Sequence, residues 1–137
     1  MAATAARLSR PYQVLRPVAN HALEIRSDPA KGRGVFARSP IAAGTLIEAA
    51  PVIVVPAEQC ALLDKTILHD YYFRWDVGDG AVPLGLVALC NHSRRPSARV
   101  RRNLANMTLD LIALAAIAPG DEITIDYHCP LWFNPEE

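Results

Sequence analysis

The stretch LGLVALCNHSRRPSARVRR, residues 84–102, joins an apolar run to three small polar residues and then to five arginines. The apolar run, 84–90, is short enough for a buried strand or a turn of helix, and its periodicity does not separate the two. Asn91, His92 and Ser93 come directly after it. Such residues often end an element because their side chains hydrogen-bond the nearby backbone. The alternative interpretation is that the buried run holds a binding site in place.

The composition is that of one folded domain without an overall charge preference. The chain has 137 residues, 51% of them hydrophobic, and a formal net charge of zero. This length suffices for a core, and zero net charge gives no general attraction to nucleic acid or to an anionic membrane. No apolar stretch approaches the roughly 18 residues of a membrane span. We expect a flexible segment at 1–20, a single domain over 21–137, and neither a membrane nor a nucleic-acid partner.

The cysteines indicate a reducing environment. Cys60, Cys90 and Cys129 are odd in number and far apart, and no C-x-x-C pair occurs. This pattern argues against a disulfide framework and against a tetrahedral zinc site. We therefore expect an intracellular, cytoplasmic protein with no bound metal.

Short alternating segments predict a mostly β fold with short helices. Eleven prolines and seven glycines divide the chain into short pieces. Strands are expected near Leu23, in two pieces around Pro51, over 97–102 and 107–116, and in the alternating stretch EITIDYH at 122–128.

The best candidate for a helical region is 57–75. Leu62, Leu63, Ile67, Leu68 and Tyr71 recur there at near-helical spacing.

Three stretches contain residues suited to chemistry. The two glycines around Arg33 let the backbone approach a ligand, and their N–H groups can cradle a carboxylate or phosphate, although a plain turn has the same composition. Asn91 offers two donors and a strong acceptor, with a satisfied turn as the alternative. Tyr127 lies on the apolar face of the last strand, where a tyrosine is usually part of the core.

Taken in order, four motifs resemble the SET domain of protein lysine methyltransferases. They are GRGVFA at 32–37, AGTLIE at 43–48, LCNHSRRPSAR at 89–99 and PGDEITIDY at 119–127. Each motif is loose, but their order and spacing are specific, and the resemblance extends from residue 23 to about residue 133. The chain most resembles the minimal viral and bacterial SET proteins, which lack large flanking domains.

The resemblance implies both a fold and an activity. The fold would be β-clip-like, with small sheets and a C-terminal pseudoknot that threads the Asn91–His92 segment beneath the last strand region. The activity would be S-adenosylmethionine-dependent protein-lysine N-methylation, with S-adenosylhomocysteine as product and a histone or another protein as substrate. The alternative is a catalytically inactive SET-fold module that binds proteins.

The resemblance also assigns residues to the methyl donor. It implies that Arg33 and Gly34 contact the methionine end of S-adenosylmethionine and that Asn91 holds its amino group. His92 would meet the adenine mainly through its backbone, and Trp132 would cover the adenine.

A second set of residues would form the lysine channel. Tyr127 matches the catalytic tyrosine of the family, and Ile125 stands at the channel position two residues before it. Aromatic residues suit such a channel because they stabilise cationic methylamines. Tyr71 is the favoured wall, with Tyr72 and Phe73 as further candidates and an ordinary aromatic core patch as the alternative.

The sequence departs from the family pattern in three places. Arg94 stands where a cysteine is common, Ser97 where an asparagine is common, and the zinc-binding Cys-x-Cys tail is absent. The resemblance to the small dimeric viral proteins implies a possible homodimer. The five arginines of the opening stretch are either a solvated face or a site for an acidic partner.

Overall fold

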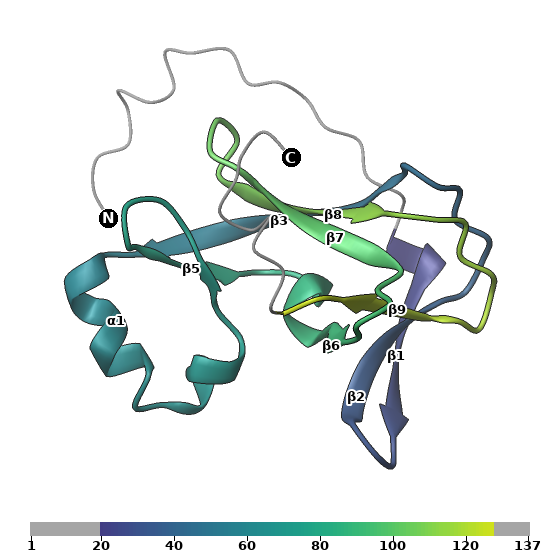
Figure 1. The fold of residues 1–137 in the computed structure, drawn as a ribbon, viewed down its shortest axis with the longest axis horizontal. Coiled ribbons are helices and arrows are strands. Elements are labelled where there is room, and N and C mark those ends of the chain that lie inside the picture. The colour runs from purple at the N-terminus through teal and green to yellow at the C-terminus, as the bar shows by residue number, and fades with distance from the viewer. Residues whose placement is uncertain (1–19, 128–137) are drawn as a thin grey trace.

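The computed structural model describes residues 20–127, which form two small sheets and a few short helices (Figure 1). In the first sheet the strand order is β1 (Leu23–Asp28), β2 (Gly32–Ala37), β9 (Glu122–Ile125) and β6 (Asn91–His92). In the second the order is β4 (Phe73–Arg74), β5 (Gly80–Pro83), β3 (Leu46–Val55), β8 (Thr108–Ala113) and β7 (Ala98–Asn103). The expected mostly β class is confirmed. The expectations for residues 1–19, Cys129 and Trp132 lie outside the described residues.

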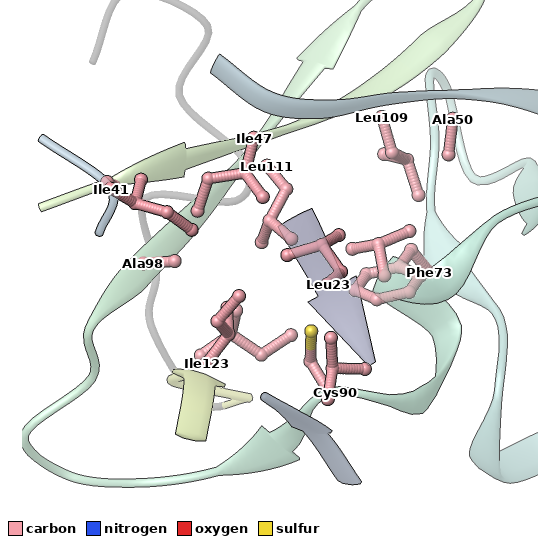
Figure 2. Close-up of a cluster of buried hydrophobic side chains, with 14 of the residues drawn as sticks. Leu23, Ile41, Ile47, Ala50, Phe73, Cys90, Ala98, Leu109, Leu111 and Ile123 are labelled. Atoms are coloured by element: carbon pink, nitrogen blue, oxygen red, sulfur yellow. The ribbon is translucent and has the colours of Figure 1, made fainter. Parts of the chain in front are cut away.

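Both sheets contribute to one hydrophobic core. Ile123 and Ile125 of β9 are buried, as the alternation of the last strand predicts, and they meet Leu109 and Leu111 of β8 in the same cluster. Figure 2 shows the sulfur of Cys90 pointing into this cluster. Burial raises the pKa of the Cys90 thiol, so this cysteine acts as a small apolar core residue.

Strand β3 runs through Pro51 without a break, and the expectation of two separate pieces was wrong. The partner of β3 changes at this proline instead. Residues up to Pro51 pair with β8, and Val52 to Val55 pair with β5. A proline lacks the N–H that a ladder needs, and its place at the change of partner limits this loss.

A β-bulge near the start of β3 directs an acidic side chain into the protein. The register with β8 shifts between Leu46 and Glu48, and both Ile47 and Glu48 are buried as a result. The Glu48 carboxylate accepts hydrogen bonds of 2.8 Å from the backbone N–H groups of Leu86 and Val87. This places a negative charge on the first turn of the 3-10 helix η4 (Leu86–Leu89).

The expected helical region 57–75 is divided, and its two helices do not pack on the core. Helix α1 (Ala57–Leu63) is followed by the 3-10 helix η3 (Ile67–Asp70), and neither contains a buried residue. Leu62 is 64% exposed and Ile67 is 76% exposed. Figure 1 shows α1 beyond β5, away from the sheet of β1, β2, β9 and β6. The expected helical region is therefore confirmed only over 57–63 and, as 3-10 helix, over 67–70.

Two of the five arginines bind within the fold instead of forming a solvated face. Arg101 donates a 2.9 Å hydrogen bond to Asp110, whose side chain is fully buried on β8. Arg102 donates to the backbone carbonyl of Trp75. Arg94 and Arg95, in the loop after β6, are exposed.

We predict that Glu48→Gln destabilises the protein by about 1–3 kcal/mol, because an amide NH₂ then faces a backbone N–H in a buried place. Urea denaturation would measure the change. Glu58→Gln, on the exposed surface of α1, is the matched control and should change stability by less than about 0.5 kcal/mol. Equal unfolding midpoints for the two variants would contradict the stabilising role of the Glu48 hydrogen bonds to Leu86 and Val87.

Candidate active site

The apolar run 84–90 contains the single turn of 3-10 helix η4, and the two-residue strand β6 follows the run directly. Val87 and Cys90 are buried, and strand β6 pairs in parallel with β9, with Asn91 opposite Thr124 and His92 opposite Ile125. The Ser93 N–H extends this ladder by donating to the Ile125 carbonyl at 2.9 Å. The buried Val87 and Cys90 therefore anchor β6 beside β9. These two strands are the neighbours that the expected pseudoknot brings together.

The amide of Asn91 is held by two acceptors. Its Nδ2 donates to Glu122 Oε2 at 2.7 Å and to the Arg33 carbonyl at 3.1 Å. Glu122 also pairs with the ammonium group of Lys31 at 3.0 Å. Three strands, β2, β6 and β9, thus meet at one side chain.

The two positions beside Arg33 require glycine for different reasons. Gly32 has a φ of +82°, in the left-handed region that glycine adopts without strain. Gly34 has no such φ, but a Cβ there would lie 2.6 Å from Glu122 Oε2 and 2.8 Å from Asn91 Nδ2. Gly34 therefore leaves the room in which Asn91 and Glu122 meet.

Tyr127 lies directly after β9 and is tied to the same segment. Its hydroxyl donates to the Cys90 carbonyl at 2.6 Å, and its backbone N–H donates to His92 Nδ1 at 3.0 Å. The rings of His92 and Tyr127 also pack against each other, with their centroids 5.2 Å apart. Burial, followed by the nearby Cys90, Tyr71 and Asp70, raises the pKa of Tyr127, so its phenol stays protonated at neutral pH.

A cavity of about 610 Å³ brings most of the candidate residues together. Its volume is within the usual range for small-molecule sites. The wall contains residues from four regions of the chain: Lys31, Gly32, Arg33, His69, Asp70, Tyr71, Tyr72, Phe73, Ala88, Leu89, Cys90, Asn91 and Tyr127.

Three of the predicted site residues that the structure describes are not part of this wall. Ile125 is 1% exposed and lies in the core. Gly34 lies beneath the Asn91–Glu122 contact, and the His92 ring packs on Tyr127. Trp132 lies outside the described residues.

The aromatic candidates differ in what they contact. The Tyr72 hydroxyl donates to Asp64 at 2.6 Å, and this hydrogen bond chiefly raises the pKa of Tyr72 to about 12. Phe73 is buried in the core. Tyr71 is half-buried and faces the same cavity as Tyr127, so it remains the best candidate for a channel wall.

Sequence reasoning did not identify Glu122, Lys31 or the Cys90 carbonyl as part of the site. The alternation of the last strand contained a signal for Glu122, since it shares a face with Thr124. Every residue has a backbone carbonyl, so the sequence contains no signal that the Cys90 carbonyl belongs to the site.

Residues 20–127 contain neither a candidate metal site nor a candidate membrane-spanning helix. No cluster of His, Cys, Asp and Glu side chains there could hold a metal ion. No helix in that range is long and apolar enough to cross a membrane.

Comparisons with known proteins agree with the geometry of this site. The SET domain profile matches residues 32–128. The H3 lysine-37 specific histone-lysine N-methyltransferase of Schizosaccharomyces pombe is 36% identical over 121 residues, 88% of this chain and 82% of the relative. A crystal structure from Plasmodium falciparum, described as a histone methyltransferase, has a TM-score of 0.62 at 27% identity and covers 81% of this chain and 96% of its own. The chain therefore belongs to the SET-domain family, and its likeness to histone-lysine methyltransferases supports protein-lysine methylation as its class of activity.

Proposed function

We propose that this protein transfers methyl groups from S-adenosylmethionine to a lysine side chain of a protein substrate. The observation that carries the proposal is the cavity shared by the Asn91 amide and the Tyr127 side chain. An ammonium-binding group and a hydroxyl meet there in one wall, as the transfer of a methyl group between two bound molecules requires.

The residues around Asn91 fit the polar end of the donor. The two amide N–H groups of Asn91 have acceptors in Glu122 and Arg33, which leaves the amide oxygen to accept from an ammonium group. Lys31 and the Gly32–Arg33 backbone lie in the same wall and suit a carboxylate. When bound, S-adenosylmethionine supplies a methyl group that its sulfonium charge already activates.

The residues around Tyr127 would align the acceptor. Since the donor is activated, the protein has chiefly to hold two reactants in line and to exclude water. The substrate lysine must be neutral, which costs about 4 kcal/mol near pH 7.5 from its free pKa. Tyr127, protonated and bonded to the Cys90 carbonyl, is unsuited to act as a base and would instead orient the amine through its hydroxyl oxygen.

Histone H3 is the substrate that we propose to test first. The fission yeast relative is specific for lysine 37 of histone H3. Asp70 in the cavity wall would favour the basic residues of such a tail.

We predict that the parent protein binds S-adenosylmethionine saturably and that Asn91→Ala weakens this binding about tenfold or more, since one hydrogen bond to a charged group is lost. Isothermal calorimetry would measure both. Circular dichroism of Asn91→Ala would check that the variant is folded. A folded parent that does not bind the donor would reject the proposed activity and favour a SET-fold module that binds proteins.

We predict that Tyr127→Phe lowers methyl transfer to histone H3 about a hundredfold, because the acceptor amine loses its alignment, while donor affinity changes little. A labelled-methyl assay would measure the rate. Tyr72→Phe is the matched control, since that hydroxyl is bound to Asp64, and its loss should be much smaller. Similar losses in the two variants would contradict the role of Tyr127.

The transfer rate should rise with pH between about 7 and 9.5, because the neutral fraction of the substrate lysine grows toward its free pKa. The raised pKa of Tyr127 keeps its phenol protonated over this range, so no opposing loss is expected. Initial rates at saturating donor would test this. A falling rate in a protein that circular dichroism shows to be folded would contradict it.

Homodimerisation and the cellular location stay predictions. The resemblance to dimeric small SET proteins motivates the first, and analytical ultracentrifugation at several concentrations would test it. The histone-directed relative makes the nucleus an alternative to the expected cytoplasmic location, and imaging of the tagged protein would distinguish the two.

A further inference from the structure

The Glu122 side chain is placed where it controls the direction of a neighbouring amide. Glu122 Oε2 lies 2.7 Å from Asn91 Nδ2, and the Arg33 carbonyl lies 3.1 Å from the same nitrogen. If the Asn91 amide turned over, its oxygen would face a carboxylate oxygen and a carbonyl oxygen at these distances. Three acceptors would then meet without a proton between them, so this arrangement is strongly disfavoured.

The amide oxygen of Asn91 is consequently directed away from Glu122 and Arg33. No buried side-chain oxygen or nitrogen within residues 20–127 lacks a hydrogen-bond partner. The Asn91 oxygen, which accepts none of the hydrogen bonds around this side chain, is therefore open to solvent. Since Asn91 lines the large cavity, that acceptor is available to a cationic ligand group.

Glu122 is itself held in place from two sides. Its Oε1 pairs with Lys31 at 3.0 Å, and its side chain is only 14% exposed. Its backbone lies in β9, opposite Phe36 of β2. Gly34 leaves this position free, because a Cβ on residue 34 would lie only 2.6 Å from Glu122 Oε2.

We propose that Glu122 is a positioning residue that sets the Asn91 amide so that its oxygen, and not its NH₂ group, meets the amino group of the methyl donor. This inference rests on the proposed function of the cavity. It predicts that loss of the Glu122 carboxylate affects ligands that carry the amino group and spares those that lack it. Gly34 is part of the same arrangement, because the absence of a Cβ there permits the hydrogen bond between Asn91 and Glu122.

The test compares Glu122→Gln with the parent and with Asp121→Asn, which removes an exposed charge at the preceding position. Calorimetry would measure affinity for three ligands: S-adenosylhomocysteine, its decarboxylated analogue, which keeps the amino group, and 5′-methylthioadenosine, which has neither group. We expect Glu122→Gln to weaken the first two about tenfold, the effect of one charge-assisted hydrogen bond. Binding of 5′-methylthioadenosine should change less than about twofold.

A second variant keeps the charge and removes the contact. Gly34→Ala places a methyl group between Glu122 and Asn91, and we expect the same ligand-selective loss from it. If it leaves the binding of all three ligands unchanged, Glu122 acts by its charge alone and the positioning role is rejected.

A measurement without ligand tests the amide directly. The side-chain NH₂ resonances of Asn91, assigned by their absence in Asn91→Ala, should move in Glu122→Gln and stay in place in Asp121→Asn. Unmoved resonances would overturn the proposal.

The outcomes separate this inference from the proposed function. A parent that binds none of the three ligands rejects donor binding in this cavity and the inference with it. A parent that binds all three, with equal losses for each ligand in Glu122→Gln, rejects the inference alone and assigns Glu122 a general structural role.

Discussion

The site depends on two residues of parallel backbone pairing, Asn91–His92 against β9. This short ladder joins segments that are more than thirty residues apart in the chain, and it places Asn91 beside Glu122 and Cys90 beside Tyr127. Two residues supply few hydrogen bonds, so the pairing needs support from outside the sheet. Burial of Val87 and Cys90 just before β6 supplies it, because apolar area removed from water stabilises the segment without any directional bond.

Two acidic side chains and two glycines complete this support in the same manner. Glu48 accepts from the N–H groups at the start of η4, and Glu122 accepts from the amide of Asn91. A Cβ at Gly85 would lie 2.8 Å from Glu48 Oε2, and one at Gly34 would lie 2.6 Å from Glu122 Oε2. Each carboxylate therefore occupies space beside a glycine that a Cβ would block. Glu48 holds the backbone N–H groups of η4, and Glu122 holds the amide of Asn91.

The sequence predicted those parts of the fold that follow from local alternation. The buried Ile123 and Ile125 of β9 are an example, and the motif order led to Asn91 and Tyr127. The expected helical region 57–75 holds two short helices instead of one, because near-helical spacing of apolar residues indicates a helix without fixing where it begins and ends. Glu122 was missed for a different reason: its partner Asn91 is distant in the chain, and only the parallel pairing of β6 with β9 brings the two together.

The same backbone segment connects the two halves of the candidate site. Asn91 lines the cavity, and Cys90, the preceding residue, accepts a hydrogen bond from the Tyr127 hydroxyl through its carbonyl. The His92 ring, one residue further, accepts the N–H of Tyr127. A displacement of this segment would therefore move the group proposed to hold the donor and the group proposed to align the acceptor in one step. Since methyl transfer would require both reactants in line, the proposed function needs residues 86–92 to be held firmly. The contacts of Glu48 with Leu86 and Val87 and the burial of Cys90 supply this support.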